Sequence, residues 1–192
     1  MNTRPYEIRW HGRGGQGAIT AAKIVAQAAY LEGYQGVTAA PSFGAERRGA
    51  PVSASTRISP EPVMLVSQVE RPNAVVVLDH TLLKYQEVTS GLDREGWLVV
   101  NTWQHPKELN IEGNFNIATA DATRVCLELG LTVAGLTVVN TAILGALIRA
   151  TKVVGMASID KAIRERFADN AIDVNLAAIT KTYEVTRLQK RR

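Results

Sequence analysis

The chain of 192 residues has one cysteine, three histidines and few aromatic residues, which make up 6% of it. Cys126 alone can form no disulfide within the chain and cannot hold an all-cysteine iron–sulfur cluster. Its apolar, helix-like neighbourhood favours a buried structural thiol over a nucleophile. The histidines, His11, His80 and His105, are scattered, and none has metal-ligand spacing with an acid or with the cysteine.

The sequence also has no apolar run of ~18 residues, which excludes a membrane-spanning helix. The N-terminus lacks the apolar stretch of a signal peptide, so we expect a cytoplasmic protein. The net charge of +4 is partly local, because residues 187–192 carry four cations, and such terminal runs are usually solvated. No nucleic-acid-binding module, Walker lysine or nucleophile elbow is present, and no catalytic set is evident.

The length suits one domain, residues 1–192, with a sizeable core. Strands alternate with helices, and the continuous apolar run at 74–78 is typical of a strand buried on both faces of a parallel sheet. We therefore expect an α/β fold with a Rossmann-like open, mostly parallel sheet, helices on both faces and one antiparallel element around 52–66. The predicted strands are 6–11, 35–40, 52–58, 63–66, 74–79, 96–101 and 115–119. The predicted helices are 18–32, 81–85, 121–129, 136–151, one capped by Ser158, and 174–190.

A glycine cluster separates the first strand from the first helix. Gly12, Gly14 and Gly17 have the G-x-G-x-x-G spacing, in which glycines permit a tight turn, close approach of a phosphate and close packing of the helix. The unpaired N–H groups at the helix start would face an anion. A turn that serves only to pack strand and helix explains the spacing equally well.

An ordinary NAD site is disfavoured, because the acidic residue expected ~20 residues after the turn is missing. Residues 37–42 contain no carboxylate, and the first one after them is Glu46. Phosphate binding survives this objection, whereas dinucleotide binding in the usual mode does not.

Arginines supply the remaining signal for anion binding. Arg13, Arg47, Arg48 and Arg57 offer planar donor groups suited to phosphate, although Glu46 could instead pair with a neighbouring arginine. Asp79 ends a buried strand, where open α/β sheets place ligands, but capping of the next helix is the favoured role for it.

Two blocks of sequence together resemble a known family. One is WHGRGGQG at 10–17, followed by the alanine-rich helix; the other is PSFGAERRGAPV at 41–52, followed by Arg57 and Ile58. The stretch VVNTAILGA at 138–146 is also similar. The chain resembles, over nearly its whole length, the gamma subunit of 2-oxoacid:ferredoxin oxidoreductases of the pyruvate or branched-chain type.

That resemblance implies a subunit of an enzyme that oxidatively decarboxylates a 2-oxo acid to an acyl-CoA and CO2. It implies thiamine diphosphate and Mg2+ in alpha and beta partner subunits and [4Fe-4S] clusters in partners that include a ferredoxin-like delta subunit. It also implies coenzyme A shared with those partners, and ferredoxin or a flavin subunit as acceptor. This chain would contribute no catalytic residue and no metal ligand. The implied coenzyme A contacts are Gly12, Arg13, Gly14, Gly15, Gln16, Gly17, Arg47, Arg48, Arg57 and Asn140.

The resemblance favours pyruvate as the substrate and leaves branched-chain or aromatic acids such as phenylglyoxylate open. One alternative is a stand-alone nucleotide- or CoA-binding protein. Another is an NAD-dependent dehydrogenase, which the missing acidic residue disfavours. Neither nucleic acid nor a membrane is an expected partner.

Overall fold

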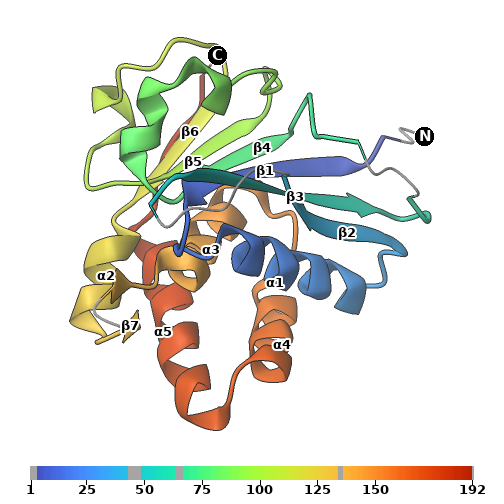
Figure 1. Cartoon of the computed structure of the whole chain (residues 1–192), viewed down its shortest axis with the longest axis vertical. Helices are drawn as coiled ribbons and strands as arrows, with labels where there is room; N and C mark the ends of the chain where they lie inside the picture. Colours follow the sequence, from blue (N-terminus) through green and yellow to red (C-terminus); the bar gives the residue numbers. More distant parts are fainter. Residues whose placement is uncertain (1–3, 43–48, 64–66, 134–135, 192) are drawn as a thin grey trace.

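A seven-stranded sheet in the order β2-β3-β1-β4-β5-β6-β9 forms the centre of the molecule (Figure 1). The computed structural model describes residues 4–42, 49–63, 67–133 and 136–191. Neighbours among β1, β4, β5 and β6 are parallel, whereas β3 runs antiparallel between β1 and β2, and β9 runs antiparallel beside β6. The strands are β1 (Tyr6–Arg13), β2 (Gly36–Pro41), β3 (Pro51–Ser59), β4 (Ala74–Val77), β5 (Trp97–Asn101), β6 (Asn116–Ala120) and β9 (Arg187–Gln189), with a separate hairpin of β7 (Thr132–Val133) and β8 (Leu136–Thr137).

The long α-helices cover one face of this sheet (Figure 1). Helix α1 packs on β1, β2 and β3, and α3 packs on β5 and β6, while α4 and α5 lie against α1 and α3. None of the helices in the described ranges is long and apolar enough to cross a membrane. The bounds are α1 (Ala18–Leu31), α2 (Ala122–Glu128), α3 (Val139–Thr151), α4 (Met156–Arg166) and α5 (Asp169–Val185).

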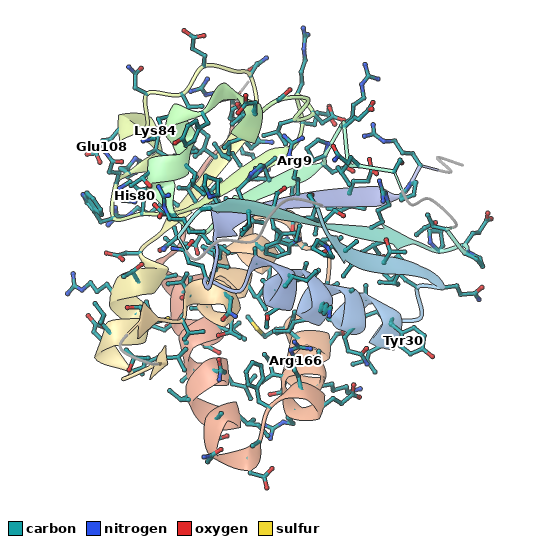
Figure 2. The ribbon with its side chains drawn as sticks, viewed as in Figure 1. Arg9, Tyr30, His80, Lys84, Glu108 and Arg166 are labelled. Atoms are coloured by element: carbon teal, nitrogen blue, oxygen red, sulfur yellow. The ribbon has the colours of Figure 1, made fainter. Side chains whose placement is uncertain are left out.

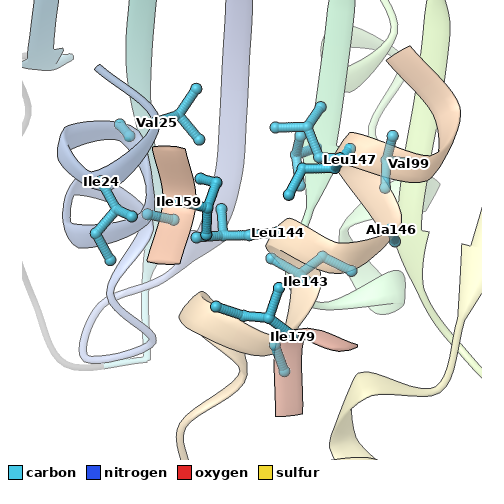
Figure 3. Close-up of a cluster of buried hydrophobic side chains, with 14 of the residues drawn as sticks. Ile24, Val25, Val99, Ile143, Leu144, Ala146, Leu147, Ile159 and Ile179 are labelled. Carbon is cyan, nitrogen blue, oxygen red and sulfur yellow. The ribbon is translucent and has the colours of Figure 1, made fainter. Parts of the chain in front are cut away.

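Alternation along the strands produces the larger core. Trp10, Val76 and Val99 point to the helical face, and all three are fully buried. Helix α3 is buried along most of its length, because it lies between the sheet and α5. Figure 3 shows its Leu144 and Leu147 among side chains of the neighbouring elements, which include Val25, Val99, Ile159 and Ile179.

The second face of the sheet carries a smaller core under short 3₁₀ helices. Val75, Val77 and Val100 point to this face and pack with Leu82 and Val88. Leu82 belongs to η1 (His80–Lys84), and Val88 belongs to η2 (Gln86–Val88). A third 3₁₀ helix, η3 (Pro106–Glu108), contacts β6 and β9. All four residues of β4 are buried, because helices cover the sheet on both faces at this strand.

The expected α/β class and mostly parallel sheet are confirmed, and the helices of the second face are 3₁₀ helices. The antiparallel element is β3, and Val63 lies outside any strand, while 64–66 are outside the described residues. Cys126 is fully buried, as predicted, and burial raises the pKa of its thiol to about 12.

Helix boundaries in the last third differ from the prediction. The helix predicted from 136 begins at Val139, because Leu136 and Thr137 form β8. Ser158 lies inside α4, where its hydroxyl donates to Glu32 at 2.6 Å; Gly155 is the N-cap. The last helix begins at Asp169 and ends at Val185, because its C-cap, Thr186, adopts an extended backbone that leads into the edge strand β9 at Arg187. The apolar spacing from 174 to 188 is compatible with a helix throughout, and only pairing with β6 decides the last residues.

Gly145 sets how closely α3 and α5 approach. A Cβ atom at this position would lie 2.1 Å from the carbonyl oxygen of Ile179 and 2.6 Å from the backbone nitrogen of Tyr183. Backbone of a packed helix cannot move aside cheaply, so Gly145→Ala should lower the free energy of unfolding by about 3 kcal/mol. Urea denaturation of the purified chain measures this loss.

Gly155→Ala is the matched control. Its φ of −82° suits alanine, and the nearest atom to the added carbon is a flexible Glu32 carboxylate oxygen at 3.2 Å. This substitution should cost less than about 1 kcal/mol. Equal losses for the two variants would show that the α3–α5 contact yields more easily than its geometry indicates.

Candidate functional site

The glycine turn continues the pairing of β1 with β3 past the end of the strand. The Gly14 N–H donates to the Ala50 carbonyl at 2.8 Å, and the Gly49 N–H donates to the Gly14 carbonyl at 3.1 Å. Inside the turn, the Arg13 N–H donates to the Gln16 side chain at 2.7 Å, and the Gln16 N–H donates to the Arg13 carbonyl at 2.9 Å. The turn is thus rigid before any ligand arrives.

Two of its glycines have backbone conformations that side chains disfavour. Gly15 has φ of 95° and Gly17 has φ of 79°. Open space lies where a Cβ of Gly15 would be, whereas a Cβ of Gly17 would lie 2.2 Å from Nδ2 of Asn140. Asn140 is buried in the first turn of α3 and accepts from the Thr141 N–H at 2.8 Å. Gly17 therefore permits α3 to pack against the turn, and Gly15 leaves the turn open on its other side.

Helix α1 begins immediately after the turn. Its N-cap is Gly17, with no side-chain cap, so the N–H groups of its first turn have no partner within the helix. They add the positive end of the helix dipole to the site. A hollow of about 800 Å³ opens here, at the carboxyl ends of β1, β4 and β5. Its lining includes Arg13, Gly14, Gly15, Gln16, Gly49, Asp79, His80, Asn101, Thr123 and Thr137.

One wall of the hollow is an ion pair between the ends of β1 and β4. Arg13 donates from Nε to Asp79 at 2.7 Å, and its other nitrogens donate to the Gly49 carbonyl at 3.1 Å and the Thr81 hydroxyl at 2.8 Å. Asp79 also caps η1 by accepting from the Thr81 N–H at 2.9 Å. The predicted capping role of Asp79 is confirmed, and the same carboxylate neutralises Arg13.

Electrostatics at Asp79 follow from these contacts. Burial alone would raise the pKa of its carboxyl group, but hydrogen bonds from Thr81 and Arg13 and the charge of Arg13 outweigh it and lower the pKa below the usual 3.8. The pair is therefore ionised at neutral pH and carries no net charge. In the described part of the hollow, attraction for an anion comes from backbone N–H groups rather than from a free cation.

Sequence reasoning missed Asn101, which ends β5 on the floor of the hollow. Its side chain donates to the Leu78 carbonyl and the Thr123 hydroxyl, both at 2.9 Å, and accepts from the Thr123 N–H at 3.2 Å. Asn101 thereby ties β4 and β5 to the start of α2. An asparagine at the end of a buried apolar strand was the available signal.

The predicted site residues separate into three groups. The structure brings Gly12, Arg13, Gly14, Gly15, Gln16, Gly17 and Asn140 together. Arg47 and Arg48 lie outside the described residues, although Gly49, next in sequence, is bonded to Gly14.

Arg57 lies apart from the other predicted site residues. It pairs with Glu7 at the start of β1, at 2.8 Å, and is only 3% exposed. Six residues of strand separate Glu7 from Arg13, or about 20 Å. Arg57 is therefore held away from the glycine turn by its ion pair with Glu7 on the neighbouring strand.

Histidines do not converge on the hollow. His80 lies at its edge, His105 caps η3, and His11 accepts from Arg9 at 3.2 Å on the other face of the sheet. Burial, and then the charge of Arg9, lower the pKa of His11 to about 4. Among the described residues, no three His, Cys, Asp or Glu side chains are placed to hold a metal ion.

A glycine turn between β1 and α1, open onto a hollow at the carboxyl ends of parallel strands, defines a Rossmann-like domain with a crevice beside that turn. The family model for pyruvate ferredoxin/flavodoxin oxidoreductase matches residues 7–185. The chain belongs to this family, and the predicted resemblance is confirmed.

Known relatives agree along the whole chain. The gamma subunit common to the pyruvate/ketoisovalerate oxidoreductases of Pyrococcus furiosus is 45% identical over 185 residues, which are 95% of this chain and 97% of the relative. The crystal structure of the pyruvate oxidoreductase subunit PORC from Thermotoga maritima has 37% identity and a TM-score of 0.84, covering 97% of this chain and 99% of that one. A 2-oxoglutarate:ferredoxin oxidoreductase from Magnetococcus marinus, solved with coenzyme A bound, shares the fold at 16% identity and a TM-score of 0.72, over 95% of this chain and 31% of that one.

Asp79→Asn tests the ion pair. The folded-state pKa of Asp79 is depressed, so its stabilisation is present above the unfolded-state pKa and is lost as the pH falls through the lower folded-state pKa. At pH 7 the variant should lose about 2 kcal/mol of unfolding free energy, and the difference from the parent should shrink below about pH 4. Chemical denaturation across pH 3–7 measures both.

The control is Asp160→Asn, which removes a carboxylate from an exposed pair with Arg164 on one helix. Exposed pairs of this kind contribute little, so its denaturation midpoint should stay near that of the parent at every pH. A pH-independent loss at Asp79 would assign its effect to helix capping alone.

Proposed function

We propose that this chain is the gamma subunit of a thiamine diphosphate-dependent 2-oxoacid oxidoreductase complex that forms acyl-CoA and CO2 from a 2-oxo acid. Its part is to hold the phosphates of coenzyme A at the glycine turn and to take part in assembly with alpha, beta and delta subunits. The observation that carries the proposal is the rigid turn, open at Gly15, beside the unpaired N–H groups of α1.

Phosphate is the ligand chemistry that such a turn favours. Backbone N–H groups at a helix start donate to anions, and a glycine lets the phosphate approach the backbone closely. Arg13 is held by Asp79, so it would orient the turn rather than supply a free positive charge. The pyrophosphate of coenzyme A then needs cations from elsewhere, and Arg47 and Arg48 precede Gly49, which is bonded to the turn.

This chain would act by binding and orienting. When bound in the partner subunits, thiamine diphosphate and iron–sulfur clusters would supply the decarboxylation and carry the electrons to ferredoxin or a flavin subunit. The glycine turn would fix the nucleotide part of coenzyme A, so that its thiol can be presented at a site in the partners. Asn140 would keep α3 against Gly17 and thereby hold the turn in place.

Pyruvate is the proposed substrate of the complex. The Pyrococcus relative is named as a subunit common to pyruvate and ketoisovalerate oxidoreductases. A gamma chain that serves two oxidoreductases does not itself select the 2-oxo acid, and coenzyme A is the reactant that both have in common. Branched-chain or aromatic acids therefore remain alternatives.

A stand-alone nucleotide- or CoA-binding protein is the second candidate. NAD binding in the usual mode is disfavoured by the sheet order, because antiparallel β3 occupies the place beside β1 where a parallel strand would end in the ribose-binding acid. The two candidates differ in whether the chain needs partners.

Co-expression with its neighbouring subunits tests the assembly. A tagged chain should bring down thiamine-binding and ferredoxin-like subunits through size-exclusion chromatography, and only the assembled complex should turn over pyruvate. A monodisperse tagged chain without these subunits, or turnover by the isolated chain, would contradict the proposal.

The paired variant Arg47→Ala/Arg48→Ala tests coenzyme A binding. If these arginines hold its phosphates, the KM for coenzyme A in the assembled complex should rise roughly three- to tenfold while the KM for pyruvate stays constant. The matched control, Arg164→Ala/Arg166→Ala, removes two exposed arginines of α4 and should leave both values unchanged. An unchanged KM for coenzyme A in the first variant would reassign that pair to subunit contacts.

A further inference from the structure

A second hollow, of about 390 Å³, lies next to the glycine-turn hollow along the same edge of the sheet. Strands β5 and β6 end at it, and α2, α5 and β9 form its sides. Thr102 and Asp121 line it, and their neighbours in sequence, Asn101 and Thr123, line the first hollow. The two hollows thus follow one another along the carboxyl ends of β4, β5 and β6.

Trp103 lines the second hollow and contacts His80, which lines the first. Its side chain is 64% exposed, whereas Trp10 is fully buried. The ring of His80, at the edge of the first hollow, meets it in an edge-to-face contact with centroids 4.8 Å apart. An indole held in place by one edge contact and left uncovered is suited to stacking with a planar ring.

One cation next to this indole, Arg187, has no carboxylate partner among the described residues. Arg124 and Lys181 both pair with Glu128, at 2.8 and 2.5 Å. Arg187 instead donates to the Trp103 carbonyl at 3.2 Å, and no described carboxylate lies within ion-pair distance of it. Its positive charge is therefore available to an anion beside the ring.

Thr119, near the end of β6, also lines the hollow, and its side-chain oxygen is buried beneath the surface. Thr119 is 1% exposed, and its Oγ1 has no hydrogen-bond partner among the described residues. Buried hydroxyl groups without partners are uncommon, since each costs about 1–3 kcal/mol. An aromatic platform and an arginine without a described carboxylate partner thus lie beside one hollow.

We propose that this second hollow is the adenine-nucleotide subsite for coenzyme A, with the adenine stacked on Trp103 and a phosphate of the nucleotide at Arg187. The inference rests on the proposed function and extends it by assigning the base end of the ligand. Contacts between the two hollows give the direction in which coenzyme A would lie. Arg13 at the glycine turn pairs with Asp79, and the next residue, His80, contacts Trp103. A ligand with its pyrophosphate at the glycine turn reaches the indole along this line.

Trp103→Ala, Trp103→Phe and Arg187→Gln in the assembled complex test the subsite. Phosphopantetheine, which has the thiol arm and one phosphate but no adenosine, is the comparison substrate. Trp103→Ala should raise the KM for coenzyme A roughly 5- to 100-fold, the loss expected for one stacked base, with little change for phosphopantetheine. Trp103→Phe should retain most of the affinity, because its ring can still stack.

Arg187→Gln separates the phosphate contact from the stacking. It should reduce the preference for coenzyme A over 3′-dephospho-coenzyme A, while the phosphopantetheine KM stays constant. Coenzyme A should also quench the exposed indole's fluorescence in the parent complex, and this quenching should be absent in Trp103→Phe.

Tyr30→Ala is the matched control, since it removes another exposed aromatic, 63% exposed, from α1 at a distance from the hollow (Figure 2). It should leave the KM for coenzyme A unchanged.

If Arg47→Ala/Arg48→Ala raises the KM for coenzyme A but Trp103→Ala does not, the subsite is refuted and the proposed function stands. If neither change alters the KM for coenzyme A, the subsite is refuted and the arginine pair is reassigned to subunit contacts, whereas turnover by the isolated chain would overturn the proposed function itself. If Trp103→Ala instead dissociates the complex and leaves the KM of the remainder intact, Trp103 is a subunit contact and the subsite is refuted.

Discussion

The ion pair between Arg13 and Asp79 is the contact on which the crevice depends. It joins the ends of β1 and β4, where parallel strands would otherwise end in independent loops. The carboxylate caps η1 as well, so it fixes where His80 leaves the sheet and meets Trp103. Because the pair is neutral, it shapes the site without binding anions itself. Under the proposed function, that division would leave phosphate recognition to backbone N–H groups, which need no charged partner to be displaced before the ligand can enter.

The antiparallel direction of β3 decides what lies next to the glycine turn. In a dinucleotide-binding sheet, the strand beside β1 is parallel and ends next to the turn with an acid for the ribose. Here β3 runs the other way, so its amino end, at Pro51, meets Arg13. The neighbour of the turn is consequently a strand start preceded by Gly49, rather than a strand end. The missing carboxylate therefore agrees with the strand order. An acidic residue introduced near position 40 would lie on β2, which β3 separates from β1, so it would not recreate a nicotinamide site.

Local patterns predicted what local physics decides. The apolar run 74–78, the glycine spacing 12–17 and the cap at Asp79 specified their elements, because burial, φ and hydrogen bonding are set within a few residues. Sheet order was not encoded in this way, so the place of β3 and the edge strand β9 required long-range pairing. The same limit applies to Arg57, whose role follows from Glu7 on the neighbouring strand, and to Trp103, whose exposure depends on α2, α5 and β9 together.

Under the proposed function, this chain would position a reactant and leave the reaction itself to its partner subunits. Coenzyme A is long, and its reactive thiol lies far from the base, so a protein can hold the nucleotide end and leave the chemistry to another subunit. Binding energy from remote parts of a substrate is most useful when the parts that hold it are rigid. The turn locked by Gln16, the α3 helix locked against Gly17 and the indole locked by His80 all satisfy that condition. Rigid elements at the carboxyl edge of one sheet can thus orient a flexible arm toward a partner without contacting the 2-oxo acid.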